Sequence, residues 1–472
     1  MKRTALIVGP AFFIAALVFH APAGLTEPAW RVAGVAAWMA IWWLTGTVPL
    51  QATSLLPIVL LPLAGVAPVG TVTASYADPV IFLFLGGFLV AATIERWQLH
   101  KRFALGTVRA VGTDARMVVL AFMLASAFAS MWISNTATVV MMLPIAMAVV
   151  AAADLPEGSG FSTALLLGVA YAASIGGVAT LIGTPPNAIF AGAARELLGE
   201  EVGFAEWMAI GVPIAIPMLA ICWVLLVRLF RVRGPIEGLG AALERERAHL
   251  GPLARGERFV IVVFVATALA WIFRAPKTIG GLHIPGLAEL IPGLTDEQIA
   301  IAAALVLFAT PLRGARHPTA LDWDSARRIP WGVLLLFGGG LALAAAFESA
   351  GLTTWLGGRI AGLRGIPYPL VLLATAALFL ALTELTSNTA TSALGMPLIV
   401  GAARGLALPA LPLMATVALA SSMAFMLPVA TPPNAGVFGS GAVEFRDMLR
   451  AGARLVVCSV LMVTIAMWIW SG

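Results

Sequence analysis

Long hydrophobic runs separated by short polar segments alternate along the whole chain. Runs of about 17–25 apolar residues are long enough to cross the hydrocarbon core of a bilayer as a helix. The pattern therefore predicts an all-α polytopic membrane protein. We expect about eleven transmembrane helices, near residues 4–20, 31–46, 50–66, 78–94, 162–193, 207–230, 258–274, 297–311, 331–347, 412–440 and 452–470.

Two further apolar runs, at residues 114–153 and 368–407, differ from the rest. Each is 40 residues long and carries Ser-Asn-Thr-Ala-Thr near its centre. Backbone that is not helical is tolerated at membrane depth where protein buries it or where it lines a wet cavity. We therefore predict two re-entrant hairpins, each of which enters and leaves on the same side.

Three sequence blocks occur twice in the same order. FLGGFLVAATIE begins at Phe84, and FGGGLALAAAFE begins 253 residues later. Ser134 opens the first SNTAT sequence, and the second follows at the same offset of 253. GTPPNA begins at Gly183, and ATPPNA begins 247 residues later. This nearly constant spacing indicates a duplication. No Lys-Ser or Lys-Thr follows the paired glycines of the first block, so they favour close helix packing over phosphate binding.

Composition excludes a soluble domain. Of the 472 residues, 60% are hydrophobic and 11% are charged, and the mean hydropathy is +0.98. An average soluble domain has about 25% charged residues. The lipid bilayer is therefore the expected environment. The net charge of +5 is explained by basic loops, so we expect no nucleic-acid partner.

The basic residues gather in alternate loops and predict the orientation. Placing those loops in the cytoplasm satisfies the positive-inside rule for a multi-pass protein of the cytoplasmic (inner) membrane. The segment 195–206 then lies outside, the N-terminus inside and the C-terminus outside. Each repeat holds five crossings, an odd number, so the two halves form inverted-topology repeats. The residues used are Arg96, Lys101, Arg102, Arg109, Arg116, Arg228, Arg231, Arg233, Arg245, Arg247, Arg255, Arg258, Arg313, Arg316, Arg327, Arg328, Arg446, Arg450 and Arg454.

The N-terminal sequence MKRTALIVGPAFFIAALVFHAPA has two interpretations. Its basic start, apolar stretch and Ala-Pro-Ala ending resemble a signal peptide. We favour an uncleaved first helix, because a polytopic protein needs no separate signal.

The Ser-Asn-Thr sequences place polar groups at the expected hairpin turns. Ser and Thr hydroxyls both donate and accept hydrogen bonds, and the Asn amide does both with separate atoms. N–H groups at the start of the second half-helix carry the positive end of the helix dipole and attract carboxylates or phosphates. Carbonyl groups at the end of the first half-helix suit a small cation. One turn could therefore hold an anion beside Na⁺.

Two Pro-Pro pairs, 185–186 and 432–433, lie inside predicted crossings. Proline lacks an N–H group and disfavours helix at the residue before it. Each pair is expected to unwind its crossing, so that two turns and two broken helices form one pseudo-symmetric site. The alternative is that these polar residues only bond to neighbouring helices, but their repetition argues against it. The groups expected to be freed are the carbonyls of Gly183 and Ala430 and the hydroxyls of Thr184 and Thr431.

Glu384 is the clearest ionisable residue in the apolar core. Such a residue at membrane depth is a functional candidate by default. Two kinds of role stay open. In a functional role, Glu384 would tune a cation site or take a proton; in a structural role, it would cap a helix end. The five histidines fall in loops or at span ends, and the apolar core contains no catalytic pair. We therefore expect a protein that is not an enzyme and needs no organic cofactor.

The chain resembles the divalent anion/sodium symporter family. The resemblance rests on both Ser-Asn-Thr sequences, both Thr-Pro-Pro-Asn blocks and SMAFMLPVATPPNAGV at residues 422–437. It extends from about Val32 to the C-terminus, and bacterial members are closest in size. It implies a homodimer that moves dicarboxylates, citrate or sulfate by an elevator mechanism.

The resemblance also implies a division into a scaffold and a mobile transport domain. The scaffold would comprise residues 1–110 and, together with the basic linker, residues 233–365. The transport domain would comprise residues 111–232, with the first hairpin, the fifth (broken) helix and the sixth helix. Residues 366–472, with the second hairpin, the tenth (broken) helix and the last helix, would complete it.

Carried onto this sequence, the resemblance implies one substrate site and two Na⁺ sites. Substrate-binding residues would be Ser134, Asn135, Thr136, Thr184, Pro185, Ser387, Asn388, Thr389, Thr431 and Pro432. The first Na⁺ site would use Ser130, Ser134, Asn135 and Gly183. The second would use Thr383, Thr386, Asn388 and Ala430.

The absence of Arg and Lys from the apolar core agrees with cation coupling. A small dianionic substrate there needs compensating charge, which two or more Na⁺ ions and helix N-termini would supply. We therefore expect a Na⁺-coupled importer of C4-dicarboxylates of the succinate, fumarate and malate class. The alternatives are a dicarboxylate exchanger or a sulfate or citrate carrier of the same fold, a proton-coupled antiporter using Glu384 and, more remotely, a membrane-embedded enzyme.

Overall fold

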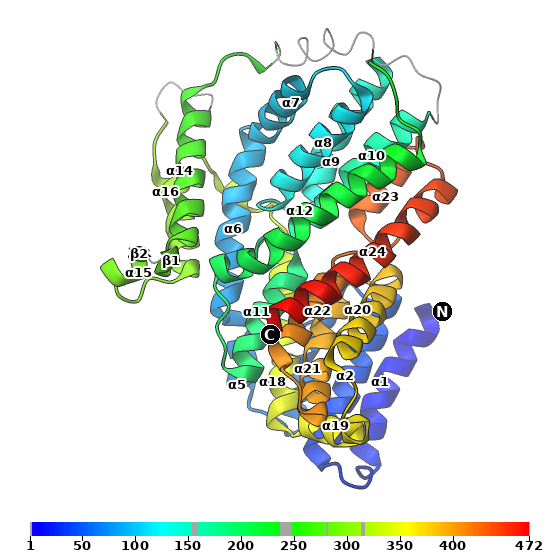
Figure 1. Cartoon of the computed structure of the whole chain (residues 1–472). Helices are drawn as coiled ribbons and strands as arrows, with labels where there is room; N and C mark the ends of the chain where they lie inside the picture. Colours follow the sequence, from blue (N-terminus) through cyan, green and yellow to red (C-terminus); the bar gives the residue numbers. More distant parts are fainter. Residues whose placement is uncertain are drawn as a thin grey trace.

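The computed structural model describes residues 2–152, 159–236, 248, 250–279, 282–312 and 317–471, and over these residues the chain is almost entirely helical (Figure 1). The first half contains α1 (Lys2–Val18), α2 (Glu27–Thr45), α3 (Leu50–Thr53), α4 (Leu56–Leu63), α5 (Val69–Ala74), η1 (Ser75–Ala77), α6 (Pro79–Arg96), α7 (Leu99–Val111), α8 (Ala115–Ser130), α9 (Asn135–Ala152), α10 (Gly160–Gly177), α11 (Pro185–Leu198) and α12 (Phe204–Leu229). The second half contains α14 (Arg255–Ile272), β1 (Lys277–Ile279), β2 (Leu282–Ile284), α15 (Leu287–Leu290), α16 (Asp296–Ala309), α17 (Trp323–Ala326), α18 (Trp331–Ser349), α19 (Leu352–Ile360), η2 (Ala361–Leu363), α20 (Tyr368–Leu385), α21 (Asn388–Leu406), α22 (Ala410–Ser421), α23 (Pro432–Gly439) and α24 (Phe445–Ser471).

Six of the described helices are long and apolar enough to cross a membrane. They are the continuous stretch Val69–Arg96, which joins α5, η1 and α6, and the helices α10, α12, α18, α20 and α24. The crossing predicted at residues 50–66 consists instead of the short helices α3 and α4, with Pro57 in the first turn of α4. Proline suits that position because its missing N–H would have no partner there.

The two runs with Ser-Asn-Thr form helical hairpins, as predicted. In the first, α8 ends at Ser130 and α9 begins at Asn135; in the second, α20 ends at Leu385 and α21 begins at Asn388. The two arms of each hairpin pack against each other. Figure 1 shows α8 and α9 toward one end of the molecule and α20 and α21 toward the other. The polar sequences therefore occupy turns between helices.

Both Pro-Pro pairs interrupt helices, as predicted. Residues 178–184, the first unwound segment, separate α10 from α11, and residues 422–431, the second unwound segment, separate α22 from α23. Pro185 and Pro432 are the first residues of α11 and α23. Proline starts a helix well because its φ angle is preset, but it keeps the residue before it out of the helix.

Several described elements lie outside the predicted crossings. The helices α7 and α19 begin 253 residues apart, at Leu99 and Leu352, so they belong to the duplication as well. A search for long apolar runs does not find α7, because basic residues interrupt its sequence LHKRFALGTVRAV. The strands β1 and β2 form a short antiparallel hairpin, which is a small departure from the all-α prediction.

The duplicated glycine blocks meet in the core. Phe84 and Phe337 are equivalent in the two repeats and pack edge to face, with ring centroids 5.0 Å apart. A Cβ added to Gly86 would lie 2.5 Å from Ala300 Cβ, and one added to Gly339 would clash as closely with its neighbours. A close-packed interior cannot absorb such overlaps. These glycines therefore permit the close helix packing that the sequence predicts.

Part of the charge pattern used to predict orientation falls outside the described residues. Arg245, Arg247, Arg313 and Arg316 are not among them, and the side chain of Arg109 is not described. His249, one of the five histidines, also lies outside the described residues.

Candidate functional site

The first tip, residues 130–136, joins α8 to α9 and gathers oxygen atoms. Ser130 is fully buried, and its Oγ donates to the Asn135 amide at 2.7 Å. The same Asn135 atom lies 3.2 Å from the carbonyl oxygen of Gly183 and 3.3 Å from that of Ala173. The structure therefore brings together three of the four residues predicted for the first Na⁺ site. The fourth, Ser134, uses its hydroxyl to accept from the N–H of Ala137 at 3.3 Å.

The Asn135 amide can face these oxygens in two ways. With its nitrogen toward them it donates to all three neighbours; with its oxygen toward them, four oxygens face one another. The orientation of an amide is assigned from its hydrogen bonds. The first orientation satisfies the protein atoms alone, whereas the second creates a group of oxygens that a cation would stabilise. Unwound backbone carbonyls coordinate Na⁺ in transporters, and hydroxyl and amide oxygens also have lone pairs to offer a cation.

The second tip, residues 383–389, contains the same hydroxyl–amide contact as the first tip, here called the central pair. Thr383 Oγ1 lies 2.7 Å from Asn388 Oδ1 and 2.8 Å from the carbonyl oxygen of Ser421. Thr383 is equivalent to Ser130 and Asn388 to Asn135, and the hydroxyl–amide distance is the same in both tips.

Two residues predicted for the second Na⁺ site are arranged differently from the central pair. The hydroxyl of Thr386 is turned to the Leu382 carbonyl at 2.8 Å and to Thr391 Oγ1 at 2.6 Å. Ala430 lies at the end of the second unwound segment and is buried. Within the described residues its only hydrogen bond outside a helix runs from its N–H to the Leu427 carbonyl at 3.2 Å. Thr383 and Asn388 are therefore the pair that the structure brings together.

Two asparagines that the sequence analysis did not assign hold the unwound segments in shape. Asn187 Nδ2 donates to the carbonyls of Gly177 at 3.1 Å and Thr180 at 2.7 Å. Asn434 Nδ2 donates to the equivalent carbonyls of Ala424 at 3.3 Å and Leu427 at 3.1 Å. All three pairs of positions are 247 residues apart. The signal was present in the sequence, since each asparagine ends a repeated Thr-Pro-Pro-Asn block.

Glu384 contacts the second unwound segment rather than the Asn388 amide. Its carboxylate is buried and accepts the N–H groups of Phe425, Met426 and Leu427 at 2.7 to 3.2 Å. Of the two roles left open for this residue, the geometry matches a cap, although the cap covers a loop and not a helix end. At the equivalent place in the first half, the Thr180 hydroxyl donates to the Met131 carbonyl.

Donors for an anion come from α9 and α21. The first N–H groups of a helix have no partner within it and carry the positive end of its dipole. Thr136 at the start of α9 is exposed, while Ser387 and Thr389 at the start of α21 are half-buried, so the helix starts can be reached. Ser387 does not cap its helix.

The starts of α11 and α23 have fewer free N–H donors for an anion than the starts of α9 and α21. Pro185 and Pro432 remove one donor each, and a second proline follows in each case. The next N–H is already used, by the Thr184 carbonyl in α11 and by the Thr431 hydroxyl in α23. Thr184 and Thr431 are also buried. The predicted role of these four residues as direct substrate ligands therefore has weaker geometric support than that of the two tips.

The two halves interlock around these segments. The helix α11 of the first half packs against α21 of the second hairpin, and α23 of the second half packs against α9 of the first. The helices α11 and α22 also touch, as do α10 and α23. Within the described residues, no group of three His, Cys, Asp or Glu side chains could hold a metal ion. The ligands that this arrangement offers are neutral oxygens and N–H groups.

Comparison with known proteins identifies the family. The family model described as the sodium:sulfate symporter transmembrane region matches residues 1–472. This chain belongs to that family. It is therefore a multi-pass membrane transporter of the divalent anion/sodium symporter type and not an enzyme.

Relatives and solved structures agree with this assignment. The sodium-dependent dicarboxylate transporter SdcS of Staphylococcus saprophyticus is 38% identical over 98% of this chain and 90% of its own length, and SdcS of Staphylococcus aureus gives the same values. Neisseria gonorrhoeae MtrF, titled as illuminating a class of antimetabolite efflux pumps, has a TM-score of 0.61 at 13% identity and covers 100% of this chain and 94% of its own. The Alcanivorax borkumensis YdaH transporter has a TM-score of 0.53 at 13% identity and covers 85% and 87%. These two structures show the shared fold.

Proposed function

We propose that this protein imports C4-dicarboxylates of the succinate, fumarate and malate class by Na⁺ symport. The observation that carries the proposal is the hydroxyl–amide pair repeated in both tips, Ser130–Asn135 and Thr383–Asn388, at 2.7 Å each. Relatives that are 38% identical over nearly the whole chain are named sodium-dependent dicarboxylate transporters, which supports both the ion and the substrate class.

In this proposal each tip binds one Na⁺ ion. The first ion would be held by Ser130, Ser134, Asn135 and Gly183. The Ser130 hydroxyl and the Gly183 carbonyl, which both face the same end of the Asn135 amide, support this site. The second would be held by Thr383, Thr386, Asn388 and Ala430. A cation between each pair would require the amide oxygen to face it, as Asn388 Oδ1 faces Thr383.

The dianion would lie between the tips. Its carboxylates would meet the N–H groups at the starts of α9 and α21 and the side chains of the Ser-Asn-Thr sequences, with the Pro-Pro blocks nearby. Among the described residues, no Lys or Arg side chain hydrogen-bonds to either tip. Charge compensation would therefore come from the bound Na⁺ ions and the helix dipoles.

Alternating access would follow an elevator mechanism in a homodimer. Residues 111–232 and 366–472 would form the moving domain, and residues 1–110 and 233–365 the scaffold. The interlocking of α11 with α21 and of α23 with α9 supports movement of both tips as one body. The halves would be inverted repeats in the cytoplasmic membrane, with the N-terminus inside and the C-terminus outside.

The test is uptake of labelled succinate into proteoliposomes with and without an inward Na⁺ gradient. We expect uptake above equilibrium only with the gradient. Uptake that ignores Na⁺ but requires dicarboxylate inside the vesicle would instead support an exchanger. Competition by sulfate or citrate at lower concentration than succinate would favour the other substrate classes.

A further inference from the structure

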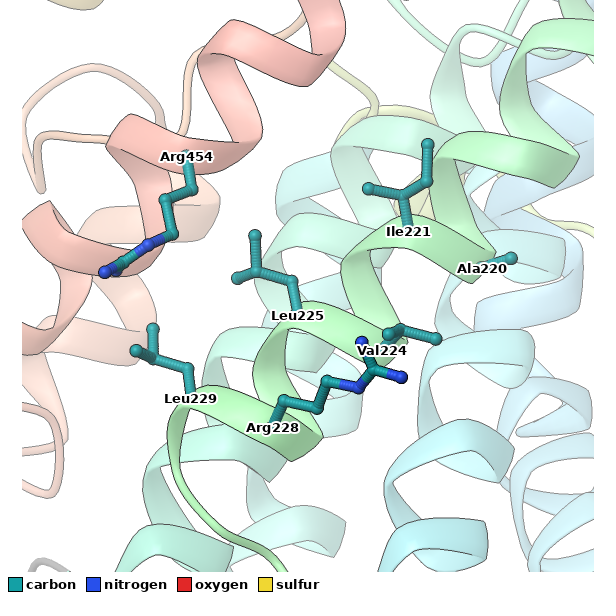
Figure 2. Close-up of a pocket in the computed structure, with 7 residues that line it drawn as sticks. All are labelled: Ala220, Ile221, Val224, Leu225, Arg228, Leu229 and Arg454. Atoms are coloured by element: carbon teal, nitrogen blue, oxygen red, sulfur yellow. The ribbon is translucent and has the colours of Figure 1, made fainter.

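A groove separates α12 of the first half from α24 of the second, away from the tips. Its volume is about 590 Å³, and its lining combines apolar side chains of α12 with Arg228 and Arg454. Figure 2 shows Leu225 and Leu229 projecting from α12 on one side of the groove and Arg454 reaching from α24 on the other. No residue predicted for the substrate or Na⁺ sites lines it.

A second, more polar groove of about 370 Å³ adjoins the first. The two share Val224 and Arg228, and the second adds Arg116, Arg231 and Arg233. The continuous surface therefore carries five arginines beside an apolar strip.

Some described arginines are paired with a carboxylate and others are not. Six arginines elsewhere, such as Arg102 with Glu257, have a carboxylate partner. None of the five in the grooves has one among the described residues. Within the described part of the chain, Arg116 Nε donates to the Val232 carbonyl at 3.1 Å and Arg454 Nη1 to the Arg450 carbonyl at 2.8 Å. Among the described residues, therefore, no carboxylate pairs with any of these five guanidinium groups.

The position of the grooves indicates the level of the membrane surface. The indole N–H of Trp223, which lines the second groove, donates to the Arg116 carbonyl at 2.9 Å. Tryptophan concentrates at the boundary between lipid and water. Farther along α24, Val457, Leu461 and Ile465 are more than half exposed, as expected for side chains that face acyl chains. The arginines thus lie where lipid headgroups meet the end of an apolar surface.

We propose that this surface binds an anionic phospholipid, with its headgroup at the arginines that line the two grooves and an acyl chain along Ile221 and Leu225. Guanidinium groups bind phosphate through charge-assisted hydrogen bonds. A free anion would not use the apolar strip. A second copy of the chain related by two-fold symmetry would bring the same arginines of both copies together, which is unfavourable.

The test uses purified full-length protein in detergent. Short-chain phosphatidylglycerol, short-chain phosphatidylcholine and glycerol phosphate are titrated separately, and bound molecules are counted by native mass spectrometry. We expect phosphatidylglycerol to bind far more tightly than the other two. Each arginine near an anionic membrane surface contributes about fivefold in affinity, so Arg228→Gln/Arg454→Gln should weaken that binding roughly 25-fold.

The matched control is Arg258→Gln/Arg328→Gln, which removes the same charge from exposed arginines on other elements and should bind phosphatidylglycerol like the wild type. Helical circular dichroism verifies that both variants fold. Equal binding of the two lipids, or an unchanged affinity in the groove variant, would overturn the proposal. Glycerol phosphate bound as tightly as the lipid would indicate a site for soluble anions instead. A loss of oligomer mass in the groove variant would mean that a second copy covers the surface.

Discussion

The two tips share a hydroxyl–amide pair but differ in what surrounds it. In the first half, Gly177 and Gly183 pack against the tip so closely that a Cβ on Gly177 would lie 2.3 Å from Asn135 Oδ1. The equivalent positions in the second half are Ala424 and Ala430. Both halves thus keep a hydroxyl–amide pair, while the packing around it differs.

The unwound segments are also held differently. Asn187 and Asn434 brace both segments in the same way, but a further contact differs. In the first half the Thr180 hydroxyl donates one neutral hydrogen bond to the Met131 carbonyl, whereas in the second the Glu384 carboxylate accepts three backbone N–H groups. Hydrogen bonds to a charged group contribute about 1.5–3 kcal/mol each, compared with about 0.5–1.5 kcal/mol for neutral ones. Glycine packing fixes the first segment, and a buried charge fixes the second.

We expect the largest effect from replacing the asparagine that each tip contributes to its hydroxyl–amide pair. We expect Asn135→Ala and Asn388→Ala each to reduce Na⁺-driven succinate uptake to background, because each removes the amide of one pair. Uptake into proteoliposomes measures this, with reconstituted protein quantified to verify insertion. Near-normal uptake in both variants would mean that the tips are structural and that the shared pair has no transport role.

Next comes the difference in how the unwound segments are held. Glu384→Ala leaves three N–H groups without an acceptor, and each costs about 1–3 kcal/mol if it stays buried. Thr180→Val loses one neutral bond, worth about 0.5–1.5 kcal/mol. Thermal unfolding in detergent should therefore show the larger drop for Glu384→Ala, with Glu384→Gln between the two. Equal drops would remove the distinction between the halves.

A smaller effect tests the packing difference. A Cβ on Gly183 would lie 2.4 Å from the Gly177 carbonyl oxygen and 2.8 Å from that of Ser130. Gly183→Ala should therefore destabilise the protein by about 1–3 kcal/mol. Ala430→Gly, at the equivalent position, should cost only about 0.5–1 kcal/mol. The same unfolding measurement compares them, and a harmless Gly183→Ala would show that the first half is not the tighter one.

We expect the smallest effect from two changes at Thr383 that remove either its methyl group or its hydroxyl. Thr383→Ser keeps the hydroxyl and loses a buried methyl, worth about 0.8 kcal/mol of stability. We expect the Na⁺ concentration for half-maximal uptake to stay as in the wild type. Thr383→Val, which keeps the shape and loses the hydroxyl, should raise it. Identical Na⁺ dependence in both variants would argue against a ligand role for this oxygen.

Local sequence signals predicted much of the fold. An apolar run or a Pro-Pro pair affects the backbone of the residues next to it. The hairpins and the broken helices could therefore be predicted without knowing any tertiary contact. The helix α7 was missed because its charged residues hide it from a hydropathy scan.

What could not be predicted depends on contacts that exist only in the folded chain. Glu384 meets backbone groups 41 to 43 residues away, and only the folded chain shows which loop they belong to. The repeated blocks mark Asn187 and Asn434, but not their partners, since those carbonyls become free acceptors only where a helix unwinds. The Thr386 hydroxyl donates to the carbonyl of Leu382, four residues before it. Such local side-chain bonds compete with other roles of a hydroxyl, and the predicted set of Na⁺ ligands did not allow for this one.

The most direct test of the account is the number of Na⁺ ions that accompany each succinate. Labelled Na⁺ and labelled succinate are followed together in proteoliposomes that contain the wild-type protein. Two tips that each hold an ion predict at least two Na⁺ per succinate and a sigmoidal dependence of uptake on Na⁺ concentration. Succinate entry without Na⁺ entry, or in strict exchange for internal dicarboxylate, would contradict it.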